Sequence, residues 1–459
     1  TEVLEDEAVF GAAAIASAPY ERRVTRRGLF ATDGGLALGA TVRDEVAFRS
    51  SYTVLRPLYD RYLAEKAREH GVTLVAETTV TSLVRERGRV IGVHTERGPA
   101  YADVVFLAEG DASHLVTQEG YERPDVARPT FLQGVKEVVR LGRERIEERF
   151  GLGPEEGAAY EFLVSNGTRR GRRLRLNLGA FLYTNQDSVS IGYVVPLENL
   201  RRDWDGDPNR LVEWLKSTRE FGAWLEGGER VAFGAKVIRG GGIREVPRLV
   251  DHGLAIGGAA SGIGIDFPYP NFTGPATLMG RLFADAVLEI RQAGGPFDAE
   301  ALEARYVEPL RTSAAYRTVE TLRDWPEFRE STRTLFGEAI DVAGGVARAL
   351  TRKPRWPGSR WWDAVHAVRV ALPLGRAGAL AADLRRLVRV LGGVPGIVRR
   401  LPSSLVAWTV NSVTGLIQGG WVPEPGFEIV FRSAGGREPV VRPPLALTWP
   451  AARILPGIA

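Results

Sequence analysis

The fold of this chain is decided by residues 253–260, which read GLAIGGAA. A short apolar run predicts a buried strand, and the small residues after it predict a tight turn. Residues 268–275, PYPNFTGP, then carry the signals of a helix start, and apolar periodicity predicts a helix from about Ala276 to Ile290. Small residues let another backbone approach closely, and a helix start offers unpaired N–H groups to an electron-rich ligand. The stretch from Val250 to Ile290 therefore predicts half of a ligand site.

The composition of the 459 residues limits the chemistry that this site can use. The chain contains no cysteine, which excludes disulfides, thiolate nucleophiles and any iron–sulfur cluster held by its own residues. Its five histidines are scattered along the sequence, which argues against a clustered zinc or non-haem iron site. If the chain carries out redox chemistry, we therefore expect an organic cofactor.

The charge of the chain is close to balanced, although its basic residues are unusual. The net charge is +4, and 55 arginines accompany only five lysines. Genome composition and heat tolerance account for such a bias most simply, so we expect no nucleic-acid partner. No signal peptide is visible at the start of the sequence.

Residues 51–113 predict a regular alternation of elements. A helix is expected at Leu58–His70, a strand at Thr73–Ala76 and a hairpin turned at Arg87-Gly88. A continuous apolar strand, Ala102–Ala108, follows and ends in the turn 109–113, EGDAS. Strands of this continuous kind are typical of parallel sheets that are buried on both faces.

Five segments, taken together, resemble a known family. They are 51–67 (SYTVLRPLYDRYLAEKA), 108–113 (AEGDAS), 132–138 (LQGVKEV), 181–185 (FLYTN) and 256–260 (IGGAA). In this order and spacing they resemble the Fix-type C subunit of electron-bifurcating electron transfer flavoprotein complexes. That family is similar to electron transfer flavoprotein–quinone oxidoreductase and, more distantly, to geranylgeranyl reductases. The resemblance covers roughly residues 1–330.

The resemblance implies an FAD bound in an extended conformation. Arg56 would lie along the phosphates, to which its guanidinium can donate paired hydrogen bonds, and the Glu109-Gly110 turn would close near the adenosine or pyrophosphate. Other residues would approach the ribityl chain and the isoalloxazine ring: Gly257, Gly258, Ala259, Gly274 and Pro275. Four residues are candidates to face the flavin: Tyr183, Asn185, Tyr269 and Asn271.

Ordinary structural roles remain open for several of these residues. Arg56 is also explained as a surface arginine that starts a helix, and Glu109-Gly110 as a turn that ends a strand. Tyr269 and Asn271 are equally explained as part of a turn bracketed by prolines. We name no catalytic acid or base, because the chemistry would belong to the flavin.

The sequence departs from the family pattern at two places. The glycine-rich G-x-G-x-x-G turn of the first strand–helix unit is absent, and we expect it to precede Thr1; natural loss is the alternative. The 151–153 run, GLG, is not this turn, because it follows a charged helical segment and opens no strand–helix unit. Where the family has an aspartate for a ribityl hydroxyl, this chain has Gly258, which removes one hydrogen bond worth roughly 0.5–1.5 kcal/mol.

We expect an α/β fold of the two-dinucleotide-binding FAD type, incomplete at its N-terminus, with an antiparallel-sheet substrate domain and a mostly helical C-terminal region. Strand candidates at 130–140, 159–165, 173–184 and 188–195 and a helix at 208–226 define the substrate domain. The basic run 169–173, RRGRR, is expected at a solvated hairpin tip, and docking of an acidic partner is the alternative. The expected division is 1–125 and 245–310 for FAD binding, 126–244 for the substrate or partner, and 311–459 for the C-terminal region.

The C-terminal region carries a local excess of positive charge. Residues 351–400 have a charge of +9, with three tryptophans at their start and an apolar helical stripe around 380–391. This pattern is typical of a segment that lies on a membrane surface, and a solvated helical subdomain is the alternative. Residues 401–423 are uncharged but too polar for a good membrane-spanning helix. We therefore expect a cytoplasmic protein associated peripherally with a membrane.

These expectations combine into one favoured function and two rivals. The favoured function is an FAD-dependent oxidoreductase that passes electrons from an electron transfer flavoprotein, with its alpha and beta subunits, to a membrane quinone, directly or through a ferredoxin-like subunit. The first rival is a polyprenyl reductase of the geranylgeranyl type, which shares the FAD and the fold. The second is a non-catalytic assembly or membrane-docking subunit that has lost its flavin.

Overall fold

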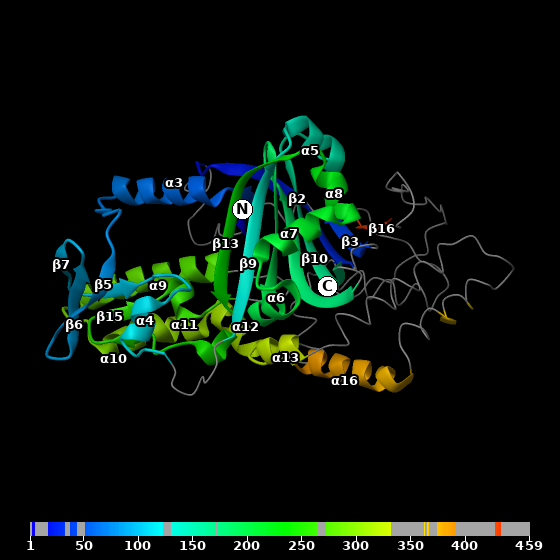
Figure 1. Cartoon of the computed structure of the whole chain (residues 1–459). Helices are drawn as coiled ribbons and strands as arrows, with labels where there is room; N and C mark the ends of the chain where they lie inside the picture. The colour runs from blue at the N-terminus through cyan, green and yellow to red at the C-terminus, as the bar shows by residue number, and fades with distance from the viewer. Residues whose placement is uncertain are drawn as a thin grey trace, which may run out of the picture.

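The computed structural model describes most of the chain up to residue 331 and parts of the remainder. The described residues are 2–4, 17–32, 37–43, 51–122, 130–169, 172–264, 272–331, 362, 365–366, 374–390 and 427–432. They form one large sheet, two small sheets and the helices that cover them (Figure 1). The expected α/β class is confirmed.

The large sheet has ten strands and forms the centre of the molecule. Its order is β1-β4-β2-β10-β11-β12-β9-β13, and β3 pairs with both β2 and β16. Neighbouring strands are antiparallel except β2 and β10, which run parallel. The strands are β1 (Glu2–Leu4), β2 (Tyr20–Thr32), β3 (Ala37–Arg43), β4 (Tyr52–Val54), β9 (Phe131–Arg140), β10 (Glu156–Arg169), β11 (Arg172–Thr184), β12 (Ser188–Pro196), β13 (Glu229–Arg239) and β16 (Phe427–Arg432).

Four helices cover one face of this sheet and enclose the larger hydrophobic core. They are α5 (Arg143–Phe150), α6 (Leu197–Trp204), α7 (Pro208–Ser217) and α8 (Arg219–Leu225). The expected single helix over 208–226 is divided, because Thr218 has extended dihedrals (φ −66°, ψ 153°) and ends α7 before α8 begins. Alternate residues of the central strands face this core, and the residues between them face the rest of the protein.

A smaller α/β unit lies on the other side of the large sheet. Its central pair is β8 (Val105–Leu107) and β15 (Leu254–Ile256), which run parallel, and β14 (Val250–Asp251) completes the sheet. A separate meander consists of β5 (Val80–Glu86), β6 (Arg89–Thr95) and β7 (Gly98–Tyr101). The helices are α4 (His114–Gln118), η1 (Gly242–Glu245), η2 (Gly258–Ser261), α9 (Thr273–Gln292), α10 (Ala299–Leu302), η3 (Glu303–Val307), α11 (Glu308–Thr312) and α12 (Ala314–Thr321).

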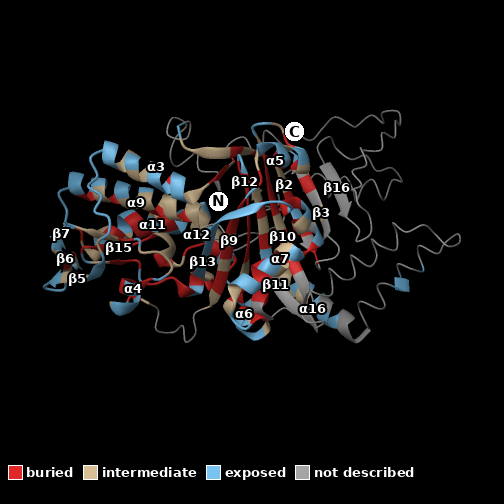
Figure 2. Cartoon of the chain, turned by 45° about the horizontal axis from the view of Figure 1, so that its top comes forward, coloured by how far each residue is buried: buried red, intermediate tan, exposed pale blue. Residues whose placement is uncertain are grey.

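The strand expected at Thr73–Ala76 does not form, and this prediction is wrong. Helix α3 (Arg56–Glu69) ends beside it, and residues 72–76 then continue without regular structure. A strand requires a hydrogen-bonded neighbour, and no described strand runs alongside this segment. Its apolar side chains are consequently open to solvent, with Val72 and Val75 exposed by 50% and 64%. Helix α3 is also largely exposed (Figure 2).

The described part of the C-terminal region is helical except for β16, which joins the large sheet. Helix α13 (Trp325–Ser331) packs against α16 (Leu374–Val390), where Trp325 and Phe328 enclose a small apolar cluster with Val390. Helix α16 contains much of the expected apolar stripe, whereas residues 401–423 lie outside the described residues. Within the described part of the chain, no helix combines the length and the apolar composition that crossing a bilayer requires.

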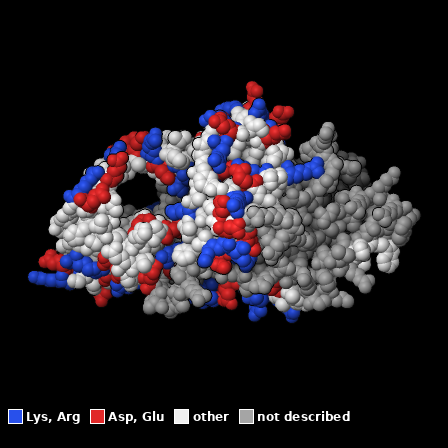
Figure 3. Space-filling view, viewed as in Figure 1, with Lys and Arg blue, Asp and Glu red and all other residues white. Residues whose placement is uncertain are grey.

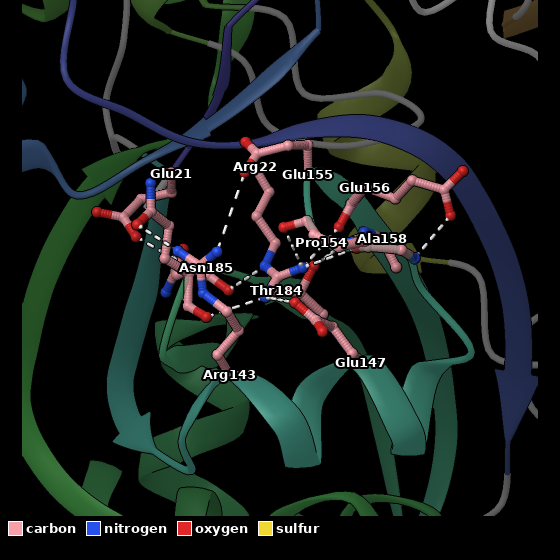
Figure 4. A network of polar contacts seen from close by, with 12 residues as sticks. Glu21, Arg22, Arg143, Glu147, Pro154, Glu155, Glu156, Ala158, Thr184 and Asn185 are labelled. Carbon is pink, nitrogen blue, oxygen red and sulfur yellow. Dashed lines mark hydrogen bonds and ion pairs between the residues drawn. The ribbon is translucent and has the colours of Figure 1, made fainter.

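A buried arginine fastens β2 to the turns at one end of the large sheet. The Arg22 guanidinium is 1% exposed, and it donates hydrogen bonds to a carboxylate oxygen of Glu147 and to several backbone carbonyls (Figure 4). Its Nε donates to the Asn185 carbonyl at 2.7 Å. The other carbonyl acceptors are those of Gly153, Pro154, Glu156 and Gln186, at 3.0–3.3 Å. One side chain thus satisfies loop carbonyls from two separate turns.

Candidate functional site

The two turns that the sequence singled out meet at one edge of the small parallel sheet. Strands β8 and β15 are in register, with Ile256 opposite Leu107, and the Gly257 N–H donates to the Leu107 carbonyl at 2.9 Å. The Glu109-Gly110 turn and the Gly257–Ala259 turn therefore leave the sheet side by side. Ligands of open α/β sheets bind outside the carboxyl ends of parallel strands, which is where these turns lie.

Two glycines of the second turn are required for different reasons. A Cβ atom at Gly257 would lie 2.1 Å from the ring of Phe106, which is stacked on Phe283 of α9 at 4.3 Å between centroids. Gly258 instead has a positive φ of 63°, and a Cβ there would lie in ordinary contact with Ala108. Gly257 thus permits close packing, whereas Gly258 permits the turn.

The Glu109 carboxylate has a structural role in this turn. Its two oxygens accept hydrogen bonds from the backbone N–H groups of Leu115 and Val116, at 3.0 and 2.9 Å. It therefore caps the start of α4, a role that the sequence did not reveal. Gly110, with a φ of 80°, lies beside Lys236, since a Cβ there would be 3.4 Å from the lysine Nζ.

The first turn is fastened to the large sheet by residues that the sequence did not predict. The Lys236 ammonium of β13 lies 3.7 Å from a carboxylate oxygen of Asp111, and the Arg239 N–H donates to the same carboxylate at 3.4 Å. Burial raises the pKa of Asp111, and the charge of Lys236 opposes that shift. The face of the large sheet opposite to the helical core is thereby directed at the Glu109–Asp111 turn.

Arg56 lies next to the start of α9 in the fold, although the two are far apart in the sequence. Its Nη1 lies 3.4 Å from Oγ1 of Thr273, the residue before Gly274 and Pro275, and its Nε contacts Asp60 at 2.8 Å. Both α3 and α9 begin here, and Figure 3 shows an opening between these two helices. Two helix N-termini and a guanidinium together favour an anionic group such as a phosphate.

The four candidate flavin-facing residues have different surroundings. The Tyr183 hydroxyl donates to a Glu161 carboxylate oxygen at 2.6 Å, and its ring is stacked on Phe181 at 5.0 Å. Burial raises the pKa of Glu161 to about 7, against the opposing effect of the Tyr183 hydrogen bond. Asn185 is fully buried in the turn below Arg22, where its amide donates to two serine hydroxyls. Tyr269 and Asn271 lie outside the described residues.

The arrangement is that of a flavoenzyme, and comparison with known proteins identifies the class. Residues 8–182 match the family model described as "FAD dependent oxidoreductase". The chain is accordingly an FAD-dependent oxidoreductase, and FAD is its cofactor. The convergence of Arg56 with two helix starts, beside the glycine turns at the strand ends, fits this cofactor.

Relatives that align with most of the chain show to which family it belongs. The chain is 32% identical over 347 residues to the probable electron transfer flavoprotein–quinone oxidoreductase YdiS of Escherichia coli K12, covering 74% of this chain and 79% of that protein. It is also 32% identical over 339 residues to Protein FixC of the same organism, covering 73% and 76%. The chain belongs to this family, as the sequence motifs predicted.

A solved structure confirms the fold. A geranylgeranyl bacteriochlorophyll reductase-like protein from Thermoplasma acidophilum superimposes with a TM-score of 0.58, covering 82% of this chain and 87% of that protein. The two sequences are 14% identical, so the likeness concerns the fold alone. Together with the match to the FAD-dependent oxidoreductase family model, this likeness confirms the expected fold.

Proposed function

We propose that the chain passes electrons from an electron transfer flavoprotein to a membrane quinone. The observation that carries this proposal is the alignment over 74% of the chain with a relative whose name states this reaction. The structure supports it with a sheet face that is directed at the Glu109–Asp111 turn, because an acceptor needs a surface beside the flavin. The absence of cysteine is consistent with electron transfer through the flavin alone.

We assign the FAD contacts to the residues that the structure gathers at the two strand ends. Arg56 would lie along the phosphates, and Gly274 and Pro275 at the start of α9 would approach the ribityl chain and the isoalloxazine ring. The backbones of the Gly110 and the 257–259 turns would approach the nucleotide and the ribityl chain. When bound, FAD can accept and release electrons singly or in pairs, and the chain's own residues would position it and exclude water.

The domain division and the partners belong to the same proposal. We divide the chain into 1–125, 126–244, 245–310 and 311–459, and strands β1–β4 of the first part belong to the sheet of the second. The partners would be the alpha and beta subunits of an electron transfer flavoprotein and a ferredoxin-like subunit, in an electron-bifurcating assembly. Peripheral docking to a membrane from the cytoplasm would bring the quinone within reach.

Stopped-flow spectroscopy of the flavin tests this function directly. The purified protein should be bleached near 450 nm by a reduced electron transfer flavoprotein and should recover its colour when a short-chain ubiquinone is added. Reduction without reoxidation by any quinone would contradict the proposal. Reoxidation by a geranylgeranyl substrate instead would favour the polyprenyl reductase alternative.

A further inference from the structure

A lysine on the large sheet is surrounded by glycines. Lys136 of β9 lies opposite Gly192 of β12 on one side and Gly234 of β13 on the other, and Gly134 is two residues before it on the same face. Directly opposed residues share a face of a sheet, so the positions next to the lysine on this face carry no side chain of their own, although the Ile238 side chain covers Gly134. We call Lys136, Gly134, Gly192 and Gly234 the glycine-floored patch.

The glycine-floored patch lies on the face that is directed at the flavin turn. Val135 and Val139 of β9 point into the core beneath the helices, so Lys136 points the other way. Two residues after Gly234 on the same strand, Lys236 shares this face and contacts Asp111. The patch therefore adjoins Lys236, which lies directly opposite Gly134 and contacts the proposed FAD-binding turn.

An aromatic pair borders the patch on its far side. A Cβ atom at Gly192 would lie 2.3 Å from the Phe181 ring, so this ring covers the glycine next to Lys136. Phe181 is in turn stacked on Tyr183, with an interplanar angle of 17°. At Gly234, on the other side, a Cβ would meet nothing within 4 Å. The patch is therefore walled by an aromatic ring at Gly192 and open at Gly234.

The Lys136 side chain is half-buried and has no hydrogen-bond or ion-pair partner within the part of the chain that the structure describes. Burial lowers the pKa of this lysine. By contrast, the Glu137 carboxylate on the opposite face of the same strand contacts both Lys216 and Arg230. A half-buried ammonium without a partner is costly unless a ligand supplies an acceptor.

We propose that the glycine-floored patch binds the electron acceptor as a flat ring that carries carbonyl oxygens, and that the Lys136 ammonium donates a hydrogen bond to one of these oxygens. The open surface at Gly234 accommodates a planar ring, and the Phe181 ring supplies an apolar edge for it. The lysine is then a residue that selects the acceptor. This inference rests on the proposed function and deepens it.

The first test compares Lys136→Met with the wild-type protein, both with flavin bound. Titration with ubiquinone-1, followed by the change in the flavin absorbance spectrum, gives the Kd of each. We expect Lys136→Met to raise this Kd about tenfold or more, as the loss of a charge-assisted hydrogen bond implies, while the flavin content stays unchanged. Lys136→Arg should recover part of the affinity. A Kd within twofold of the wild type would overturn the inference, and so would loss of the flavin, which would show that Lys136 holds FAD instead.

The second test fills the floor without changing the charge. Gly234→Leu should weaken ubiquinone-1 binding, because the new side chain would occupy the open floor beside Lys136. Ala235→Leu is the matched control, since this exposed residue on the same strand faces the opposite way. Equal Kd values for the two variants would contradict the inference.

The two proposals fail in distinguishable ways. A wild-type protein that binds flavin but neither binds nor is reoxidised by a quinone overturns the proposed function, and the quinone assignment of the patch with it. A wild-type protein that is reoxidised, and a Lys136→Met variant that behaves identically, overturn only the role of the patch.

Discussion

Replacing Arg22 should destabilise the protein more than replacing almost any other arginine. The guanidinium is 1% exposed and contacts six acceptors, five of which are backbone carbonyls (Figure 4). Arg22→Met removes every donor at once, and each buried acceptor left without a partner costs roughly 1–3 kcal/mol. Water can reach some of these loops, so we expect the free energy of unfolding to fall by about 3–5 kcal/mol, as for other broken buried networks.

Urea unfolding followed by tryptophan fluorescence measures this loss, because Trp204 and Trp224 are buried in the core of the large sheet. Arg202→Met is the matched control: this side chain is 56% exposed and contacts only Asp203 and Asn199 among the described residues, so its removal should cost less than about 1 kcal/mol. Arg22→Lys should recover only part of the loss, since an ammonium cannot reproduce the planar fork. An Arg22→Met variant within 1 kcal/mol of the wild type would refute this reasoning.

Three further predictions concern the site. Gly257→Ala places a Cβ atom against the Phe106 ring and should cost about 1–3 kcal/mol of stability, measured by thermal unfolding, together with part of the bound flavin. Arg56→Met should weaken FAD binding about tenfold or more in a fluorescence titration of the flavin-depleted protein, whereas Arg61→Met, on the exposed side of the same helix, should not. Glu161 has a pKa of about 7 in the folded protein against an ordinary value of 4.5, so the folded state holds this proton more tightly than the unfolded state. The stabilisation that this difference gives is complete below pH 4.5 and is lost as the pH rises to 7. The free energy of unfolding of Glu161→Gln should lack this pH-dependent component, which is worth about 3 kcal/mol. The same pH dependence in the variant and the wild type would contradict the raised pKa of Glu161.

The sequence predicted correctly those elements that depend only on neighbouring residues, such as a hairpin of adjacent strands or a single helix. The hairpin of β5 and β6 and the helix α9 follow from turn residues and apolar periodicity. Pairing between distant segments could not be predicted in this way. The apolar segment 73–76 has the composition of a strand but lacks a neighbour, and β13 was missed because it is exposed on most of its length and shows no clear alternation.

The candidate site residues were predicted from family motifs, and their contacts could be seen only in the structure. The turns at 109–110 and 257–259 were predicted, but the capping of α4 by Glu109 depends on a helix of only five residues, which gives a weak sequence signal. The contact between Arg56 and Thr273 joins positions 217 residues apart. Lys136 looked like an ordinary strand residue, because its glycine neighbours come from two other strands.

The parallel pairing of β2 with β10, and of β8 with β15, has a consequence for biosynthesis. Strand β2 can pair with β10 only after residues 156–164 have left the ribosome, and β8 can pair with β15 only after residues 254–256 have left it. Neither unit of the protein is a continuous stretch of chain, so β2 would be translated with only β3 and β4 to pair with, and the apolar strand β8 would be translated before its partner β15. We expect nascent chains to depend on chaperones, and fragments divided between residues 107 and 254 to refold only when both are present.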